Sequence, residues 1–155
     1  TMKYYVYGMG ELAGVYDKAS YAIQKAESTS GVVISSGQTY IWEKGNRDLS
    51  YDTGTAPFQA GDKSSLEACQ EYMQQFDAEE VDLSGCTIEQ VLYIINKGLP
   101  VIAMLNQNQA VLLTAYGSNA VTYIDPATGG SNTVTYDQMN QMAAMTGYTF
   151  IGYVQ

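Results

Sequence analysis

The chain has 155 residues, of which 46% are hydrophobic and only 15% are charged, so a disordered chain is excluded and one compact, ordered protein is expected. The formal net charge is −9, and residues 61–155 hold ten acidic and two basic residues. Such a surface repels phosphate backbones and anionic headgroups, so we expect no nucleic-acid partner. The apolar runs fall far short of the roughly 20 residues that cross a bilayer, so we expect no membrane insertion.

The first block, residues 1–46, is predicted to form a small ββαββ unit. Runs of β-branched and aromatic side chains predict four strands, at residues 3–7, 12–16, 32–35 and 39–43. Asp17 is expected to cap a helix between the two strand pairs. The inward face of this helix is predicted from helical spacing and carries Ala19, Ala22, Ile23 and Ala26. One helix laid on a small antiparallel sheet buries that face.

Residues 47–63 have no hydrophobic period and are rich in Gly, Asp and Ser, which predicts a linker or surface loop. A stretch of this length is uncommon inside a compact domain, so we expect it to separate two units or to lie along a partner's surface. The small first block is marginal alone. We therefore expect it to dock on the second block or on another copy of the chain, and either outcome to bury its tyrosine-bearing strand faces.

The second block, residues 64–155, is predicted to consist of helices packed on an antiparallel sheet. Three capping boxes mark the starts of helices: Ser64 with Glu67, Thr87 with Gln90, and Thr135 with Gln138. Apolar stripes continue each helix, and the first of them carries Leu66, Cys69, Met73 and Phe76. Strands are expected at residues 101–105, 110–116, 121–124 and 149–154. Short connections between strands favour an antiparallel sheet, so the fold class is α+β.

A family resemblance depends on the stretch from Gly98 to Gly130. Its second predicted strand opens as Gln109-Ala110-Val111-Leu112-Leu113-Thr114-Ala115-Tyr116, and its third ends in Ile124-Asp125-Pro126. Residues 64–155 resemble the back half of the papain-like cysteine peptidases that process bacteriocin leaders. In that family the second strand opens with a catalytic histidine, in a pattern like H-A-V-x-L-x-G-Y. The resemblance implies a papain-like cysteine peptidase fold for this block.

The resemblance also implies a remnant site of Cys69, Gln109 and Asp125. Cys69 stands in the place of the nucleophile that opens a helix in the family, Gln109 replaces the histidine, and Asp125 matches the third member. Lys63 stands where an oxyanion glutamine is expected, and Gln70 where a glycine usually follows the cysteine. The chain contains no histidine at all. Since an amide cannot take a proton from a thiol near neutral pH, no catalytic residue is expected to be active.

Plainer interpretations of these residues stay open. Cys69 fits a small hydrophobic residue in a helix stripe, and Asp125 fits a cap of the turn into Pro126. Gln109 could hydrogen-bond either neighbour as an uncharged substitute for the histidine. Cys86 precedes a helix cap, where a packing role is favoured over reactivity. Two cysteines without histidines are too few for a structural zinc site, so no metal and no cofactor are expected.

These observations favour a catalytically inactive cysteine-peptidase-like domain that binds a peptide or protein partner. We expect it to belong to a larger bacterial exported or surface protein, so an extracellular or cell-surface location is suspected. One alternative is a structural or assembly module of a surface protein, with a possible homo-oligomer formed through its strands. A second alternative is an active cysteine peptidase with Cys69 as nucleophile and Asp125 as a poor base.

Overall fold

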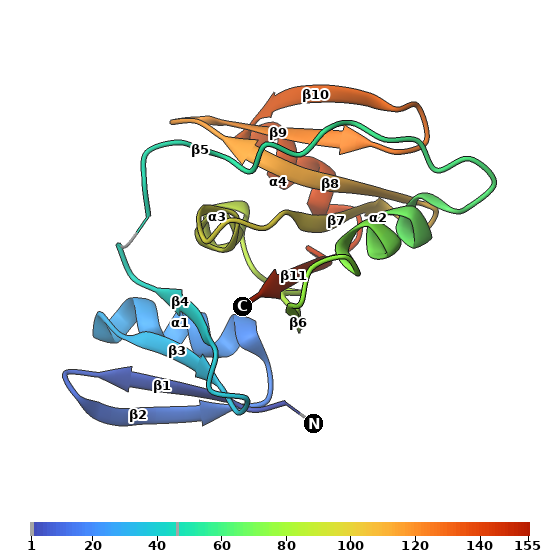
Figure 1. The fold of residues 1–155 in the computed structure, drawn as a ribbon. Coiled ribbons are helices and arrows are strands. Elements are labelled where there is room, and N and C mark those ends of the chain that lie inside the picture. The colour runs from blue at the N-terminus through green and yellow to red at the C-terminus, as the bar shows by residue number, and fades with distance from the viewer. Residues whose placement is uncertain (1, 46) are drawn as a thin grey trace.

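The structure is a computed structural model that describes residues 2–45 and 47–155. Its elements form two antiparallel sheets with helices packed against them, a mixed α/β architecture (Figure 1). The ends of the predicted first block, residues 1 and 46, lie outside the described residues. No helix in the described ranges is long and apolar enough to cross a bilayer.

The first sheet has the strand order β2-β1-β3-β4 and carries one helix, as the ββαββ pattern predicts. Its elements are β1 (Tyr4–Gly8), β2 (Glu11–Tyr16), α1 (Ala19–Thr29), β3 (Val32–Ser35) and β4 (Tyr40–Glu43). The four apolar residues predicted for the inward face of α1 are all buried. The expected cap is wrong, because Lys18 is the N-cap residue and makes no side-chain cap bond. Asp17 lies one residue too early to cap α1.

The second sheet has the order β10-β9-β8-β7-β11-β6, and β5 pairs with the far end of β8. Its strands are β5 (Tyr51–Asp52), β6 (Glu79–Asp82), β7 (Val101–Asn106), β8 (Gln109–Tyr116), β9 (Ala120–Asp125), β10 (Gly130–Thr135) and β11 (Phe150–Val154). Both faces are buried. Val111 and Leu113 of β8 enter the core shared with α3 (Ile88–Asn96) and α4 (Tyr136–Ala144). Ala110 and Leu112 point the other way, to α2 (Ser65–Met73).

The three helices of this block start at the predicted caps, with a full capping box at two of them and a single side-chain cap at α2. Thr87 and Thr135 each form a full capping box with the glutamine three residues on. Ser64 accepts a hydrogen bond from the Glu67 backbone N–H and caps α2. These caps satisfy backbone donors that the first turn of a helix leaves without partners.

Residues 51–63, which we call the strap, belong to the segment predicted as a linker or surface loop, and after β5 they form no regular element. The strap lies along the second sheet, where the Thr53 backbone N–H donates to the Thr114 carbonyl at 2.9 Å. Nearer its end, the Ala60 N–H donates to the Pro126 carbonyl at 2.8 Å. Its Phe58 ring stacks on Tyr72 of α2, with centroids 4.9 Å apart. Backbone pairing and one aromatic anchor therefore hold a segment that has no hydrophobic period.

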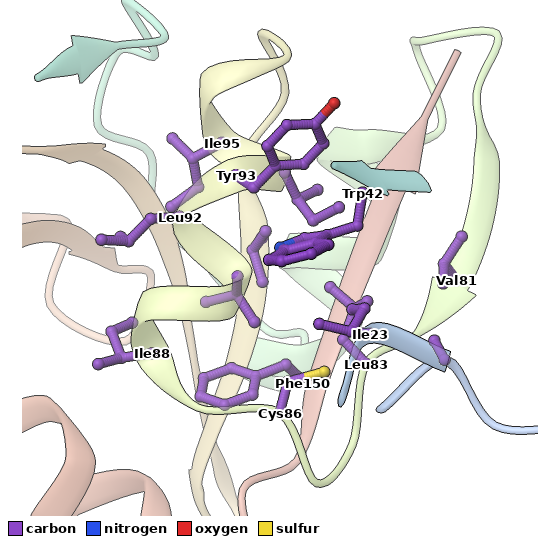
Figure 2. Close-up of a cluster of buried hydrophobic side chains, with 14 of the residues drawn as sticks. Ile23, Trp42, Val81, Leu83, Cys86, Ile88, Leu92, Tyr93, Ile95 and Phe150 are labelled. Atoms are coloured by element: carbon purple, nitrogen blue, oxygen red, sulfur yellow. The ribbon is translucent and has the colours of Figure 1, made fainter. Parts of the chain in front are cut away.

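The two units share one hydrophobic core (Figure 2). Ile23 and Trp42 come from the first unit and pack among side chains of the second, namely Val81, Leu83, Cys86, Ile88, Leu92, Tyr93, Ile95 and Phe150. The rings of Trp42 and Tyr93 meet with centroids 6.0 Å apart. The first unit thus docks on its own second block. The expected burial of its tyrosines is found only on the face towards α1, where Tyr4 is 4% exposed. On the other face Tyr7 is 39% and Tyr40 56% exposed.

Candidate functional site

Gln109 and Asp125 lie at the same end of the second sheet. Gln109 begins β8 and Asp125 ends β9, and these strands are antiparallel neighbours. The Gln109 Nε2 donates to Asp125 Oδ2 at 3.4 Å. Gln109 Oε1 also accepts from the Asn106 side chain at 3.2 Å. Gln109, which stands at the histidine position of the resemblance, is therefore held by hydrogen bonds of its side-chain amide. An amide has no basic nitrogen.

Asp125 organises the turn after β9 at the same time. Its Oδ1 accepts from the Ala127 backbone N–H at 3.0 Å. Its main-chain carbonyl accepts from the Gly129 N–H at 2.8 Å. The turn-capping interpretation and the contact with Gln109 thus use different oxygen atoms of one residue.

Cys69 is fully buried in the middle of α2. It packs in an apolar cluster with Met73, Ala110, Leu112 and Ile124. Burial, and then the negative charge of Asp125, raise the pKa of the Cys69 thiol from 9.0 to about 12. A thiol with that pKa is protonated near neutral pH, and only the thiolate is a strong nucleophile.

Ser65, rather than Cys69, is the first residue of α2. This differs from the expected pattern, since Cys69 lies one turn inside the helix instead of opening it. Ser65 is buried, and its Oγ accepts from the Ala110 backbone N–H at 2.8 Å. Its hydroxyl thus fastens the start of α2 to the start of β8, next to Gln109. Sequence reasoning missed this residue, although the Ser64-Ser65 pair before an apolar stripe could have indicated it.

Two further polar residues, Lys63 and Gln59, lie at the end of the strap and bind to neighbouring elements. Lys63 forms an ion pair with Glu71 of α2, and both side chains are exposed. Gln59 of the strap donates from Nε2 to the Thr128 carbonyl at 3.3 Å. A hollow of about 200 Å³ lies between the strap and α2, lined by Phe58, Gln59, Ala60, Lys63, Ala68, Glu71 and Tyr72. The strap and α2 therefore pack together beside the Gln109–Asp125 pair.

Cys86 is also buried, in the core shared by the two units. Burial first, and then the charges of Asp82 and Glu27, raise the pKa of its thiol from 9.0 to about 12. Desolvation therefore exceeds the acidifying effect of the nearby N-terminus of α3. Within residues 2–45 and 47–155, no three acidic or thiol side chains gather closely enough to hold a metal ion.

Comparison with known proteins adds one similar structure. No protein-family model and no curated protein sequence matches the chain. A crystal structure of a candidate C39-like peptidase from Bacillus anthracis is similar with a TM-score of 0.43 and 20% sequence identity. The similarity covers 60% of this chain and 60% of that one.

Proposed function

We propose that the chain is a catalytically inactive cysteine-peptidase-like domain with a papain-like fold that acts by binding a peptide or protein partner. The observation that carries this proposal is the absence of any histidine in the 155 residues, with Gln109 at the position of the base. A polypeptide is the natural ligand of a peptidase-derived surface, because its walls and strand edges suit an extended chain.

The chemistry of the remaining groups supports catalytic silence. Cys69 is buried and its pKa is raised to about 12, so a strong base would be needed to activate it. A carboxylate is in general a much weaker base than a thiolate. That of Asp125 already accepts bonds from Gln109 and Ala127. A site without an activated thiolate, a general base or an oxyanion donor loses most of the rate enhancement of a working catalytic triad.

Alkylation of the native protein tests this proposal. Iodoacetamide near neutral pH should modify Cys69 and Cys86 slowly in the folded chain and rapidly in denaturant, as followed by intact-mass spectrometry. Restoring the base alone, as Gln109→His, should give little peptidase activity because Cys69 stays buried. Rapid native labelling of Cys69, with cleavage that Cys69→Ala abolishes, would establish the active peptidase instead.

A second candidate function, a structural or assembly module, is favoured by one observation. The face of the first sheet that α1 leaves open carries exposed Tyr7, Leu12, Val15 and Tyr40. Contiguous exposed apolar residues often mark a protein interface. Light scattering across a dilution series should then detect an oligomer that Val15→Lys disrupts. A monomer at high micromolar concentration removes this second candidate.

A further inference from the structure

Ser65 and Cys69 lie one turn apart on the same buried face of α2, but their surroundings differ. Cys69 packs in an apolar cluster that also contains Ala110 and Leu112 of β8. Ser65 is the first residue of the helix, and its hydroxyl makes two hydrogen bonds to the backbone around the start of β8. Ser65 therefore presents a polar atom to the end of the sheet, whereas apolar side chains surround the Cys69 thiol.

The two hydrogen bonds of Ser65 place its hydroxyl beside Gln109. The Ser65 Oγ accepts from the Ala110 N–H at 2.8 Å and donates to the Asn108 carbonyl at 3.5 Å. These two groups belong to the residues on either side of Gln109. The Ser64 cap fixes the helical turn from which the Ser65 side chain projects. The hydroxyl is thus held against the backbone of the residue at the histidine position of the resemblance.

Asp125 completes a row of polar groups at this end of the second sheet. The Gln109 Nε2 donates to Asp125 Oδ2 at 3.4 Å and so joins the start of β8 to the end of β9. Burial, and then the charge of Asp125, raise the pKa of the Cys69 thiol, which places this carboxylate near the buried face of α2. A hydroxyl, an amide and a carboxylate, supplied by α2, β8 and β9, therefore gather in one place.

This row has the chemistry of a nucleophilic triad whose middle member is replaced. In such a triad a hydroxyl or a thiol contacts a base, and a carboxylate orients that base from its other side. The amide of Gln109 can hydrogen-bond but cannot take up a proton. The free N–H groups of a helix start also stabilise a negative charge, and this effect fades within the first turn. It therefore favours an anion at Ser65 more than at Cys69.

We infer that Ser65, and not Cys69, stands at the nucleophile position of the remnant site. Cys69 is then a packing residue one turn further along α2. Both the nucleophile and the base of a working cysteine peptidase are replaced in this chain, the first by Ser65 and the second by Gln109. This inference rests on the proposed function, because it takes the site to be derived from that of a peptidase.

A thiol and an imidazole introduced together at the two positions test the inference. The test variant carries Ser65→Cys with Gln109→His, and Ser65→Cys alone is its matched control. Both also carry Cys69→Ala, so that the introduced thiol is the only one on this face of α2. Iodoacetamide labelling, in which the thiolate displaces iodide, is followed by peptide mass spectrometry across a series of pH values.

The imidazole should activate the introduced thiol. An imidazolium partner stabilises the thiolate, so the pKa of the thiol should be lower by about 2 in the test variant than in the control. Its labelling near neutral pH should be about tenfold faster, since the gain in thiolate is partly offset by weaker nucleophilicity. A hydroxyl that is only a tether between α2 and β8 predicts no difference between the two chains.

The introduced imidazole gives a second measurement that needs no new thiol. The chain has no histidine, so Gln109→His supplies the only imidazole signals in an NMR titration. Ser65→Ala removes a hydroxyl that can donate to the neutral ring, so the imidazole pKa should rise by about 0.3 or more. The matched change one turn away, Cys69→Ala, should move it by less than about 0.1.

Any of three results would overturn the inference. The introduced thiol could react equally with and without the imidazole, or the imidazole pKa could ignore Ser65→Ala. Activation of Cys69 in the Gln109→His chain would return the nucleophile position to Cys69. Circular dichroism checks that each variant is folded, and the NMR titration decides if Ser65→Cys is not. Peptide cleavage by the native chain would contradict the proposed function without moving the nucleophile position, so the two failures are distinguishable.

Discussion

At the scale of single residues, the surroundings of the two thiols decide what they can do. Cys69 and Cys86 are both fully buried, and burial is the main cause of the raised pKa of each thiol, about 12. The same thiols at a solvent-exposed helix start would ionise far more readily. Their position in the core therefore makes them packing residues.

This burial predicts a loss of stability in alkali. In the unfolded chain the thiols ionise near 9, while in the folded chain they stay protonated up to about 12. Ionisation thus favours the unfolded state between these values. The stability is fully present below about pH 9 and is lost as the pH rises towards 12, by at most about 1.4 kcal/mol per pH unit for each thiol.

Urea denaturation at a series of pH values measures that slope. The double variant Cys69→Ala, Cys86→Ala serves as the control, because it removes both thiols while the tyrosines still titrate. Its free energy of unfolding should fall less steeply between pH 9 and pH 11 than that of the native sequence. Identical slopes would show that the thiols ionise as readily in the folded chain as in the unfolded one.

At the scale of elements, local sequence explains the helices better than the strands. The α3 helix has a full capping box, and its apolar residues Ile88, Val91, Leu92 and Ile95 are all buried. By contrast, β6 and β10 are short and polar, so alternation of apolar residues could not reveal them. The partner of β6 is β11, far away in sequence, whereas β10 forms a hairpin with β9, the strand before it. The path of the strap was not predictable from local sequence either, since its backbone bonds run to Thr114 and Pro126.

The Thr87 cap of α3 gives a prediction that a conservative variant, Thr87→Ser, can check. Thr87→Ala removes the hydroxyl that accepts from the Gln90 N–H at 3.2 Å, and should lower the free energy of unfolding by about 1 kcal/mol. Thr87→Ser keeps that acceptor and should lose much less. Urea midpoints measure both. An equal loss in the two variants would mean that the methyl group, and not the cap, stabilises α3.

The close approach of β11 to the core gives another prediction. A Cβ added at Gly152 would lie 2.6 Å from Leu83 Cδ1 and 3.4 Å from Ile94 Cγ2. Leu83 is fully buried, so Gly152→Ala should destabilise the fold by about 1–3 kcal/mol. Gly117→Ala is the matched control, because nothing lies within 4 Å of its added Cβ. Comparable thermal midpoints for the two variants would contradict the packing described for β11.

The candidate site was predictable only at residues that belong to a sequence pattern, either the family resemblance or an apolar helix stripe. The resemblance indicated Gln109, at the start of β8, and Asp125, at the end of β9, and the structure places Gln109 Nε2 3.4 Å from Asp125 Oδ2. The apolar stripe indicated that Cys69 could be a packing residue. The bond from Ser65 to the Ala110 N–H was not predictable, because it joins residues that are distant in sequence through a single hydroxyl. Whether these residues are the remnant of a catalytic site stays a prediction.

At the scale of the whole molecule, one shared core joins two sheets. Trp42 comes from the first unit and packs on Tyr93 of the second, and a hydrogen bond from Gln90 to Glu27 joins them at the surface. The first unit has a single helix over its sheet and so buries little apolar surface by itself. We therefore expect its order to depend on the second block.

This dependence predicts a single unfolding transition. Trp42 fluorescence reports the junction and far-UV circular dichroism reports both sheets, so their urea curves should coincide. A fragment of residues 2–45 should remain unfolded in isolation. A Trp42 transition at clearly lower urea, or a folded fragment, would show that the first unit is an independent domain.

The central claim, a peptidase-like domain without catalysis, is tested most directly by a search for new peptide ends. The purified chain is incubated near neutral pH with a diverse peptide mixture, and mass spectrometry compares the products with those of Cys69→Ala. The account predicts no cleavage beyond that of the variant, because no histidine is present and Cys69 is buried. Reproducible new ends that appear with the native chain and vanish in Cys69→Ala would contradict it.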